Sequence, residues 1–305
     1  MLRFTLRRLG LAVLVALLVS AATFSLLHLS GDPAAALAGE GATLQDIEYV
    51  RKQYGFDRPL LVQYADWLRR ALGGDFGMSV YLKRPVSEVI VERAPVTMTL
   101  GALALGFALL LSIPLGVLAA VRPNTILDRT ALTIAVVGQA MPSFFFALIL
   151  IMIFGVKLRW LPITGSDTWR HFIMPAVALG YYATPAIMRL TRAGMIEVLG
   201  SDYIRTAYAK GLRPRIVLFK HALRNAIIPV VSVAAVQLGF MLGGSIVIET
   251  IFNLNGLGRL AWQSIQRLDF EVMQAVILVI AGFYVLLTFL ADLLNAFLDP
   301  RIRVT

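Results

Sequence analysis

Side chains able to carry out covalent or acid–base chemistry are few in this sequence, and they are scattered. The sequence has no cysteine, so disulfide bonds and thiolate metal sites are excluded. Its three histidines, His28, His171 and His221, lie in separate segments and indicate no metal cluster. We therefore predict no catalytic residues and no metal site in this chain.

A nucleotide-binding loop is also absent. The phosphate-cradling pattern G-x-x-x-x-G-K-[ST] does not occur, and the G-L-G-R that begins at Gly256 lacks its lysine. We therefore expect no cofactor on this chain. If ATP drives its function, ATP and its magnesium ion must bind to partner chains.

The composition is typical of a membrane protein. Hydrophobic residues make up 58 % of the 305 positions, whereas a soluble domain has about 45–50 %. Several apolar runs reach the roughly 20 residues that a helix needs to cross a bilayer. The net charge of +10 could suggest nucleic acid. However, the excess lies in segments that flank the apolar runs, as the positive-inside rule predicts, so we expect a lipid bilayer and no nucleic acid.

The apolar runs predict an all-α polytopic fold with six transmembrane helices. The predicted spans are residues 9–29, 96–121, 130–156, 172–190, 226–248 and 272–297. The first run continues past its small residues for a full span, so we interpret it as an uncleaved helix. Its flank carries Arg3, Arg7 and Arg8, which places the N-terminus in the cytoplasm. Six spans return the C-terminus to the same side, so we expect a multi-pass inner-membrane protein.

The predicted organisation has four parts. They are the cytoplasmic N-terminus with the first span (1–29), an extracytoplasmic helical segment (30–95), a five-helix core (96–297) and a cytoplasmic tail (298–305). In the second part, Thr43 is suited to cap a helix over 44–54, and further helices are predicted over 60–72 and 86–93. This segment could pack over helix ends or contact an extracytoplasmic partner, and both roles stay open.

Polar side chains inside the predicted spans are few, the notable ones being Gln139, Thr184 and Gln237. Such residues line a translocation path or, more commonly, form hydrogen bonds between helices. No Lys, Arg, Asp or Glu lies near the centre of a span. This disfavours an intramembrane enzyme and a self-sufficient proton- or sodium-coupled carrier, whose coupling usually depends on carboxylates at mid-membrane.

A short helix is predicted in the basic segment between the fourth and fifth spans. Ser201 or Asp202 is suited to its N-cap, Gly211 to its C-terminal end, and Pro214 prevents continuation. One apolar stripe follows the i, i+3, i+4, i+7 spacing: Ile204, Ala207, Tyr208 and Gly211. So short a helix is marginal alone in water, and we expect its stripe to dock in a groove of a soluble partner.

The same segment resembles a known family. The run R-T-A-Y-A-K-G at 205–211, followed by H-A-L-R-N-A-I-I-P ending at Pro229, is similar to the EAA loop of bacterial ABC-importer permeases, in the form of the dipeptide/oligopeptide/nickel branch. Arg205-Thr206-Ala207 stand where the general motif has Glu-Ala-Ala. The runs G-D-F-G-M-S at 74–79, G-G-S-I-V-I-E-T-I-F at 243–252 and L-D-P-R at 298–301 agree with the "B" permease of that branch. Asn255 departs from it, because a proline commonly stands there.

The resemblance implies a type I ABC importer (MetI-like) fold and a heterodimer with a second, related permease. It also implies two ATPase subunits, an extracytoplasmic substrate-binding protein and import of di- or oligopeptides. Nickel chelates, glutathione or oligosaccharides are the alternatives. Residues 201–211 would be the helix that couples the permease to an ATPase. Its site residues would be Ser201, Asp202, Ile204, Arg205, Thr206, Ala207, Tyr208, Lys210 and Gly211.

Overall fold

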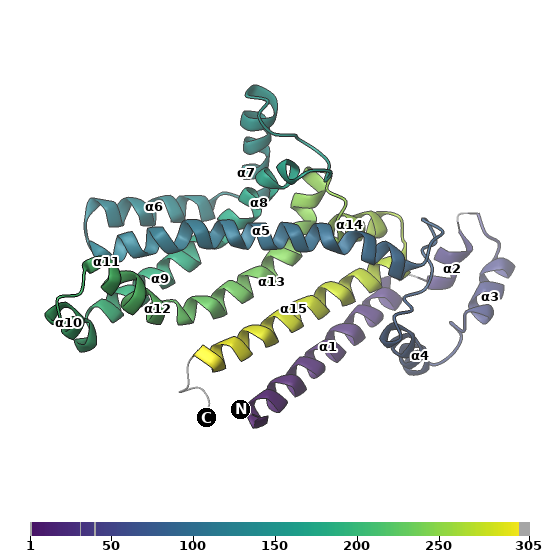
Figure 1. Ribbon diagram of the computed structural model, residues 1–305. Helices are drawn as coiled ribbons and strands as arrows, with labels where there is room; N and C mark the ends of the chain where they lie inside the picture. The colour runs from purple at the N-terminus through teal and green to yellow at the C-terminus, as the bar shows by residue number, and fades with distance from the viewer. Residues whose placement is uncertain (1, 31, 40, 299–305) are drawn as a thin grey trace.

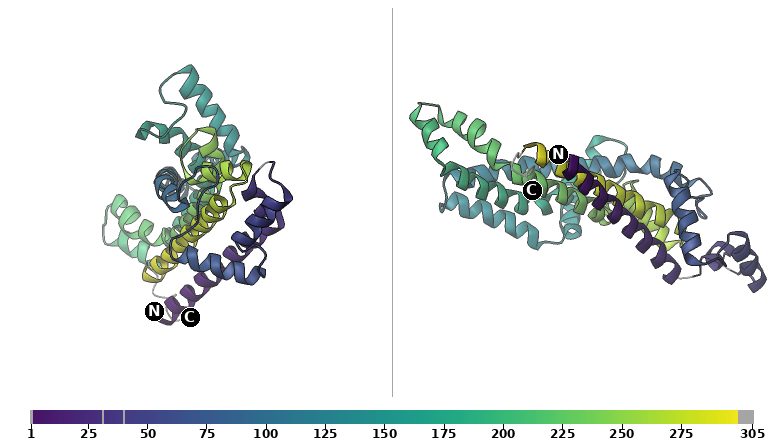
Figure 2. Two further views of the ribbon diagram at one scale, coloured as in Figure 1. Left: turned by 90° about the vertical axis from the view of Figure 1, so that its right-hand side faces the viewer. Right: turned by 90° about the horizontal axis from the view of Figure 1, so that it is seen from below.

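The computed structural model describes residues 2–30, 32–39 and 41–298. The regular secondary structure of this part of the chain is helical apart from one isolated bridge between Met78 and Pro85. The predicted tail at 298–305 lies almost wholly outside the described residues. The helices form an elongated bundle (Figures 1 and 2). One end carries α10 (Asp202–Ala209), and we call it the α10 end. The opposite end carries α14 (Leu257–Gln266), and we call it the α14 end.

Four long apolar helices confirm four of the predicted spans. They are α1 (Leu2–Ser30), α5 (Val86–Val121), α13 (Ile228–Ile251) and α15 (Phe270–Leu298). The prediction of a separate helix over 86–93 was wrong, because α5 runs through Pro95 without a break. Val86, Val89 and Ile90 are buried against α14 and α15, and this burial holds the first turns of α5 in helical form.

The other two predicted spans are interrupted. The one over 130–156 is divided into α6 (Ile126–Ala140), α7 (Ser143–Leu150) and a π-helical segment η1 (Ile151–Lys157). Pro142 disfavours helical geometry at the residue before it, so α6 ends there, and α7 leaves the bundle at an angle (Figure 1).

The predicted span over 172–190 is likewise a succession of short pieces. They are η2 (Trp169–Phe172), α8 (Ile173–Gly180), η3 (Tyr181–Ala183) and α9 (Thr184–Leu199).

Small residues let the central helices pack closely. A Cβ atom added to Gly180 of α8 would lie 2.2 Å from the carbonyl oxygen of Ala104 in α5. One added to Gly116 of α5 would lie 2.8 Å from Cβ of Thr191 in α9. Close contact between small residues is the usual packing mode of helices in a bilayer. The central unit of α5, α8, α9 and α13 is therefore tightly fitted, and α1 packs beside α15 at its edge.

Short helices cover the α14 end: α2 (Pro33–Ala38), α3 (Leu44–Gln53), α4 (Leu60–Leu72) and α14 itself. The predicted cap at Thr43 is confirmed, because it forms a reciprocal capping box with Asp46. Trp67 of α4 packs against Phe24 of α1. The sequence pattern did not reveal α2 or α14. Residues 253–258 are rich in Asn and Gly, which favour turns, yet α14 begins within them. Leu257, Leu260 and Ala261 are buried on one side of this helix.

The remaining short helices lie between α10 and α13. They are α11 (Pro214–Ile216), the π-helical segment η4 (Val217–Ala222) and α12 (Leu223–Ala226). They return the chain from α10 to the membrane-spanning part of the bundle.

Candidate functional site

The predicted helix at 201–211 is present as α10. Its C-terminus forms a Schellman motif: Gly211 has a φ of +75° and donates to the carbonyl of Tyr208, while Leu212 donates to that of Ala207. Ser201 occupies the N-cap position, but its hydroxyl donates to the carbonyl of Val198 and not to α10. Backbone geometry therefore ends α10 at Gly211, whereas no side-chain hydrogen bond caps its N-terminus.

Two of the four residues of the predicted apolar stripe, Ile204 and Ala207, face the chain itself, whereas Tyr208 and Gly211 are exposed. The exposed fractions of Ile204 and Ala207 are 1 % and 7 %. They pack in a cluster with Val117 of α5, Met195 of α9 and Val217 of η4, among others. The prediction that this stripe docks in a soluble partner was therefore wrong for these two side chains. They seat α10 on the bundle, because burying them there offsets the low intrinsic stability of a two-turn helix.

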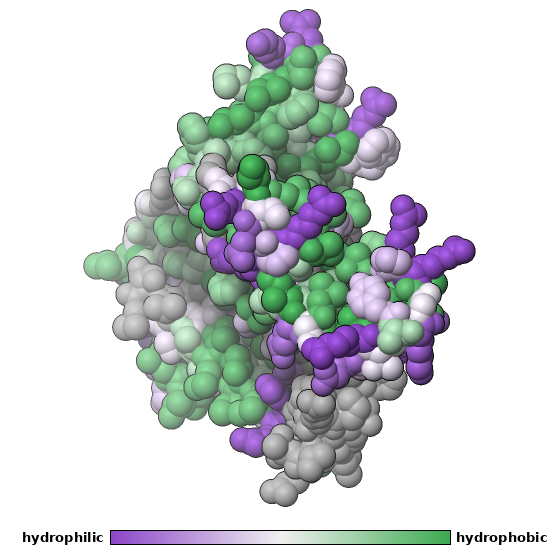
Figure 3. Space-filling model, turned by 90° about the vertical axis from the view of Figure 1, so that its left-hand side faces the viewer, coloured by the Kyte–Doolittle hydropathy of each residue, from purple (hydrophilic) through white to green (hydrophobic). Residues whose placement is uncertain are grey.

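The opposite side of α10 is exposed and mixed in character. Tyr208 is 47 % exposed, and the Arg205 side chain is 80 % exposed. The remaining exposed positions are Asp202, Tyr203, Thr206, Ala209 and Lys210. We call this side, defined by all seven residues, the free face of α10. Figure 3 shows hydrophilic side chains gathered at the α10 end beside apolar surface. Tyrosine and arginine are enriched in protein interfaces, so this composition suits contact with another protein.

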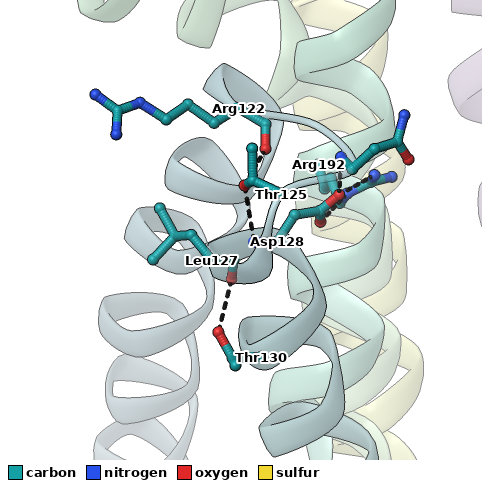
Figure 4. A network of polar contacts seen from close by, with 7 residues as sticks. Arg122, Thr125, Leu127, Asp128, Thr130 and Arg192 are labelled. Atoms are coloured by element: carbon teal, nitrogen blue, oxygen red, sulfur yellow. Dashed lines mark hydrogen bonds and ion pairs between the residues drawn. The ribbon is translucent and has the colours of Figure 1, made fainter.

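An ion pair that the sequence did not reveal braces the α10 end (Figure 4). Arg192 of α9 donates to both carboxylate oxygens of Asp128 in α6, over 2.7 and 2.6 Å. The backbone N–H of Asn124 donates to the same carboxylate. Asp128 is 2 % exposed and lies outside the predicted span at 130–156. The hydrogen bonds from Arg192 lower the pKa of the Asp128 carboxyl, so the bidentate pair is charged at neutral pH.

One local signal for this brace was available. Thr125-Ile-Leu-Asp128 has the T-x-x-D spacing of a capping box before an apolar run. In the structure the hydroxyl of Thr125 donates to the carbonyl of Arg122, and the N–H of Asp128 donates to that hydroxyl at a long 3.5 Å. The pattern thus locates the turn between α5 and α6, but it does not identify Arg192 as the partner.

The three polar residues predicted inside spans have different surroundings. The side chain of Gln139 lies outside the described residues. Thr184 is buried, its hydroxyl donates to the carbonyl of Gly180, and its own carbonyl accepts from Ser112. The hydroxyl is therefore satisfied four residues back along the chain, and the carbonyl joins α9 to α5. A path-lining role for Thr184 stays a prediction. Gln237 does border a space, a cavity of about 420 Å³ between α13, η3 and the start of α7.

A fully buried carboxylate at the α14 end was also missed. Glu249 lies near the end of α13, whereas we predicted it in the loop beyond the fifth span. Its carboxylate accepts from the Thr97 hydroxyl of α5 over 2.8 Å and from the Arg259 N–H of α14 over 2.9 Å. The N–H of Leu257 donates in turn to Thr97. Through these hydrogen bonds Glu249 fixes α14 to both α5 and α13.

The approach of this carboxylate depends on a glycine. A Cβ atom added to Gly256 would lie 2.4 Å from a Glu249 oxygen and 2.6 Å from the Thr97 hydroxyl. Steric crowding thus accounts for the glycines of the G-L-G sequence at the start of α14. We call the group of Thr97, Glu249 and the first N–H groups of α14 the Glu249 knot.

These features define a helical membrane protein whose described residues hold no group of three or more potential metal ligands. The known proteins agree. Residues 112–304 match the family described as "Binding-protein-dependent transport system inner membrane component", and residues 1–101 match the N-terminal region of the corresponding membrane components. The chain belongs to this family and is a permease subunit of an ABC importer.

Relatives support the same assignment, and a solved structure has a similar fold. The glutathione transport system permease protein GsiC of Escherichia coli strain K12 is 42 % identical over 304 residues, which cover 99 % of each chain. The GsiC protein of Shigella dysenteriae matches equally well. The fold is similar to that of the methionine ABC transporter MetNI, with a TM-score of 0.59 and 22 % identity over 69 % of this chain and 96 % of the other.

Proposed function

We propose that this chain forms half of the translocation pathway of an ATP-driven importer for short peptides, and that α10 couples it to an ATPase. The observation that carries the coupling role is the division of α10 into two sides. Ile204 and Ala207 fix it to α5, α9 and η4, while the free face with Tyr208 and Arg205 is available to a partner. A push on the free face would therefore move the ends of α5 and α9.

The proposed assembly follows from the family. A second, related permease completes the pathway, and two ATPase subunits bind ATP and magnesium. An extracytoplasmic binding protein delivers the substrate. The α10 end and both termini lie in the cytoplasm, and α2 to α4 lie on the outer side. This chain is non-catalytic and carries no cofactor.

Peptides are the proposed substrates, and glutathione is a specific candidate among them. It is a tripeptide, and the GsiC relatives named for its transport are 42 % identical over nearly the whole length. Nickel chelates and oligosaccharides are alternatives without a comparable observation in their favour.

Reconstitution tests the proposal. Proteoliposomes that contain both permeases, both ATPases and the binding protein should accumulate labelled glutathione or a dipeptide only when ATP is supplied to the ATPase side. Vesicles with this chain alone should neither hydrolyse ATP nor accumulate either peptide. ATP hydrolysis by the purified chain, or gradient-driven uptake without partners, would contradict the proposed function.

A further inference from the structure

The cavity beside Gln237 carries an inference about what passes through the membrane. Gln237 lies near the middle of α13, on which Phe240 and Gly244 also border the cavity. Tyr182 of η3 and Ser143 at the start of α7 complete its polar lining. Both η3 and the α6–α7 break belong to the interrupted spans. The breaks thus bring polar groups from three elements to one space at mid-bundle.

These three polar groups are free to bind something. Within the part of the chain that the structure describes, the side chains of Ser143, Tyr182 and Gln237 have no hydrogen-bond partner. A polar group at membrane depth is costly unless it meets protein, water or a ligand. Thr184 provides the contrast, because its hydroxyl bonds to the backbone of its own segment. The cavity therefore suits water or a polar solute, whereas hydrocarbon would leave all three groups unpaired.

The lining is also without charge. None of the residues around the cavity is Lys, Arg, Asp or Glu. A glutamine amide both donates and accepts, and each hydroxyl can do either, which complements the N–H and C=O groups of a peptide. Tyr182 and Phe240 add aromatic surface for apolar side chains. The volume of about 420 Å³ lies within the roughly 300–1,000 Å³ that is typical of small-molecule sites.

We propose that Ser143, Tyr182 and Gln237 form an uncharged passage site that hydrogen-bonds the backbone amides of peptide substrates. The site limits substrates by size and leaves selection by charge to other parts of the importer. The proposal rests on the proposed function, because it assigns the site to a peptide pathway.

Thiol labelling of the assembled importer in membrane vesicles tests the site. The chain has no cysteine of its own, so single substitutions S143C, Y182C and Q237C give an unambiguous signal on this subunit. The probes are two small membrane-impermeant methanethiosulfonates, one anionic and one cationic. The controls are S112C, whose parent side chain is buried between helices, and L286C on the exposed apolar side of α15.

The expected result is labelling at positions 143, 182 and 237 at least about tenfold faster than at either control, and slowed by trialanine under ATP turnover. The anionic and cationic probes should react within about threefold of each other. A charge about 8 Å away would separate their rates more than about tenfold at an effective dielectric constant near 20.

Rates no faster than the controls, or a strong preference for one charge, would overturn the proposal even if peptide uptake is intact. Rapid, charge-independent labelling that trialanine does not slow would also overturn it, since the cavity would then hold water alone. Failure of the uptake assay in reconstituted vesicles is a separate result, because it addresses the proposed function.

Discussion

Replacing Ile204 by alanine should unseat α10 from the bundle. The side chain is almost fully buried, in a cluster that joins α5, α9 and η4. Truncation of a buried isoleucine to alanine costs about 2–5 kcal/mol, and α10 has only eight residues with which to absorb this loss. A free-energy difference of about 1.4 kcal/mol corresponds to a tenfold change in an equilibrium constant. A cost of about 2 kcal/mol therefore raises the population in which α10 is detached from the bundle roughly 30-fold.

Hydrogen–deuterium exchange of the intact complex measures this directly. Amides of α10 should exchange roughly 30-fold faster in I204A than in the wild type, by the same relation of tenfold per about 1.4 kcal/mol. Amides in the middle of α5 should be unchanged. The importer should still hydrolyse ATP, but with less peptide accumulated per ATP, because a loosely held α10 transmits less displacement.

A matched substitution on the free face separates seating from docking. Y208A removes a half-exposed side chain, so α10 exchange in the permease without its ATPase should stay as in the wild type. Binding of the ATPase should instead weaken. Unchanged α10 exchange in I204A would refute the view that the apolar stripe holds α10 to the chain. Equal exchange effects of I204A and Y208A would refute the division into two sides.

Two further substitutions test the brace and the knot. D128N should lower the thermal unfolding midpoint at pH 8, because it breaks the charged pair with Arg192. The folded-state pKa of Asp128 is depressed, so the loss of stability in D128N should be constant above the ordinary carboxyl pKa near 4 and should shrink below it. A difference in unfolding midpoint that grows on acidification would contradict the charged Asp128–Arg192 pair. G256A should destabilise the protein by about 1–3 kcal/mol, because the added Cβ overpacks against Glu249. The control G282A should not destabilise it, because its added Cβ meets nothing within 4 Å. Equal thermal unfolding midpoints of G256A and G282A would contradict the steric role of Gly256.

The sequence predicted the parts of the fold that depend on local pattern. Long apolar runs identified the four continuous spans, and the left-handed Gly211 and the Thr43 cap follow from short-range chemistry. Hydropathy could not show that the third and fourth spans are broken, because a proline in an apolar run can be absorbed or can end a helix. Pro95 is absorbed in α5, whereas Pro142 separates α6 from α7, and the difference lies in tertiary packing.

The position of α10 in the chain was predicted, but its orientation on the bundle was not. Periodicity found the stripe on α10, yet a stripe does not say whether its cover is the same chain or a partner. The Asp128–Arg192 pair and the Glu249–Thr97 bond join residues 64 and 152 positions apart, so no local pattern could reveal either one. Gln237 and Thr184 were equivalent as polar residues in apolar runs, and only the surrounding helices distinguish a cavity-lining group from a helix-joining one.

The length of α5 has a mechanical consequence. Its residue Thr97 belongs to the Glu249 knot, and its residue Val117 belongs to the cluster that seats α10. Twenty residues of continuous helix, which include Pro114, separate these contacts, about 30 Å at 1.5 Å per residue. A continuous helix that is held at both ends conveys tilt as well as force. A small rotation imposed at α10 would therefore swing α14 through a similar angle, without any chain of side-chain rearrangements between the two ends.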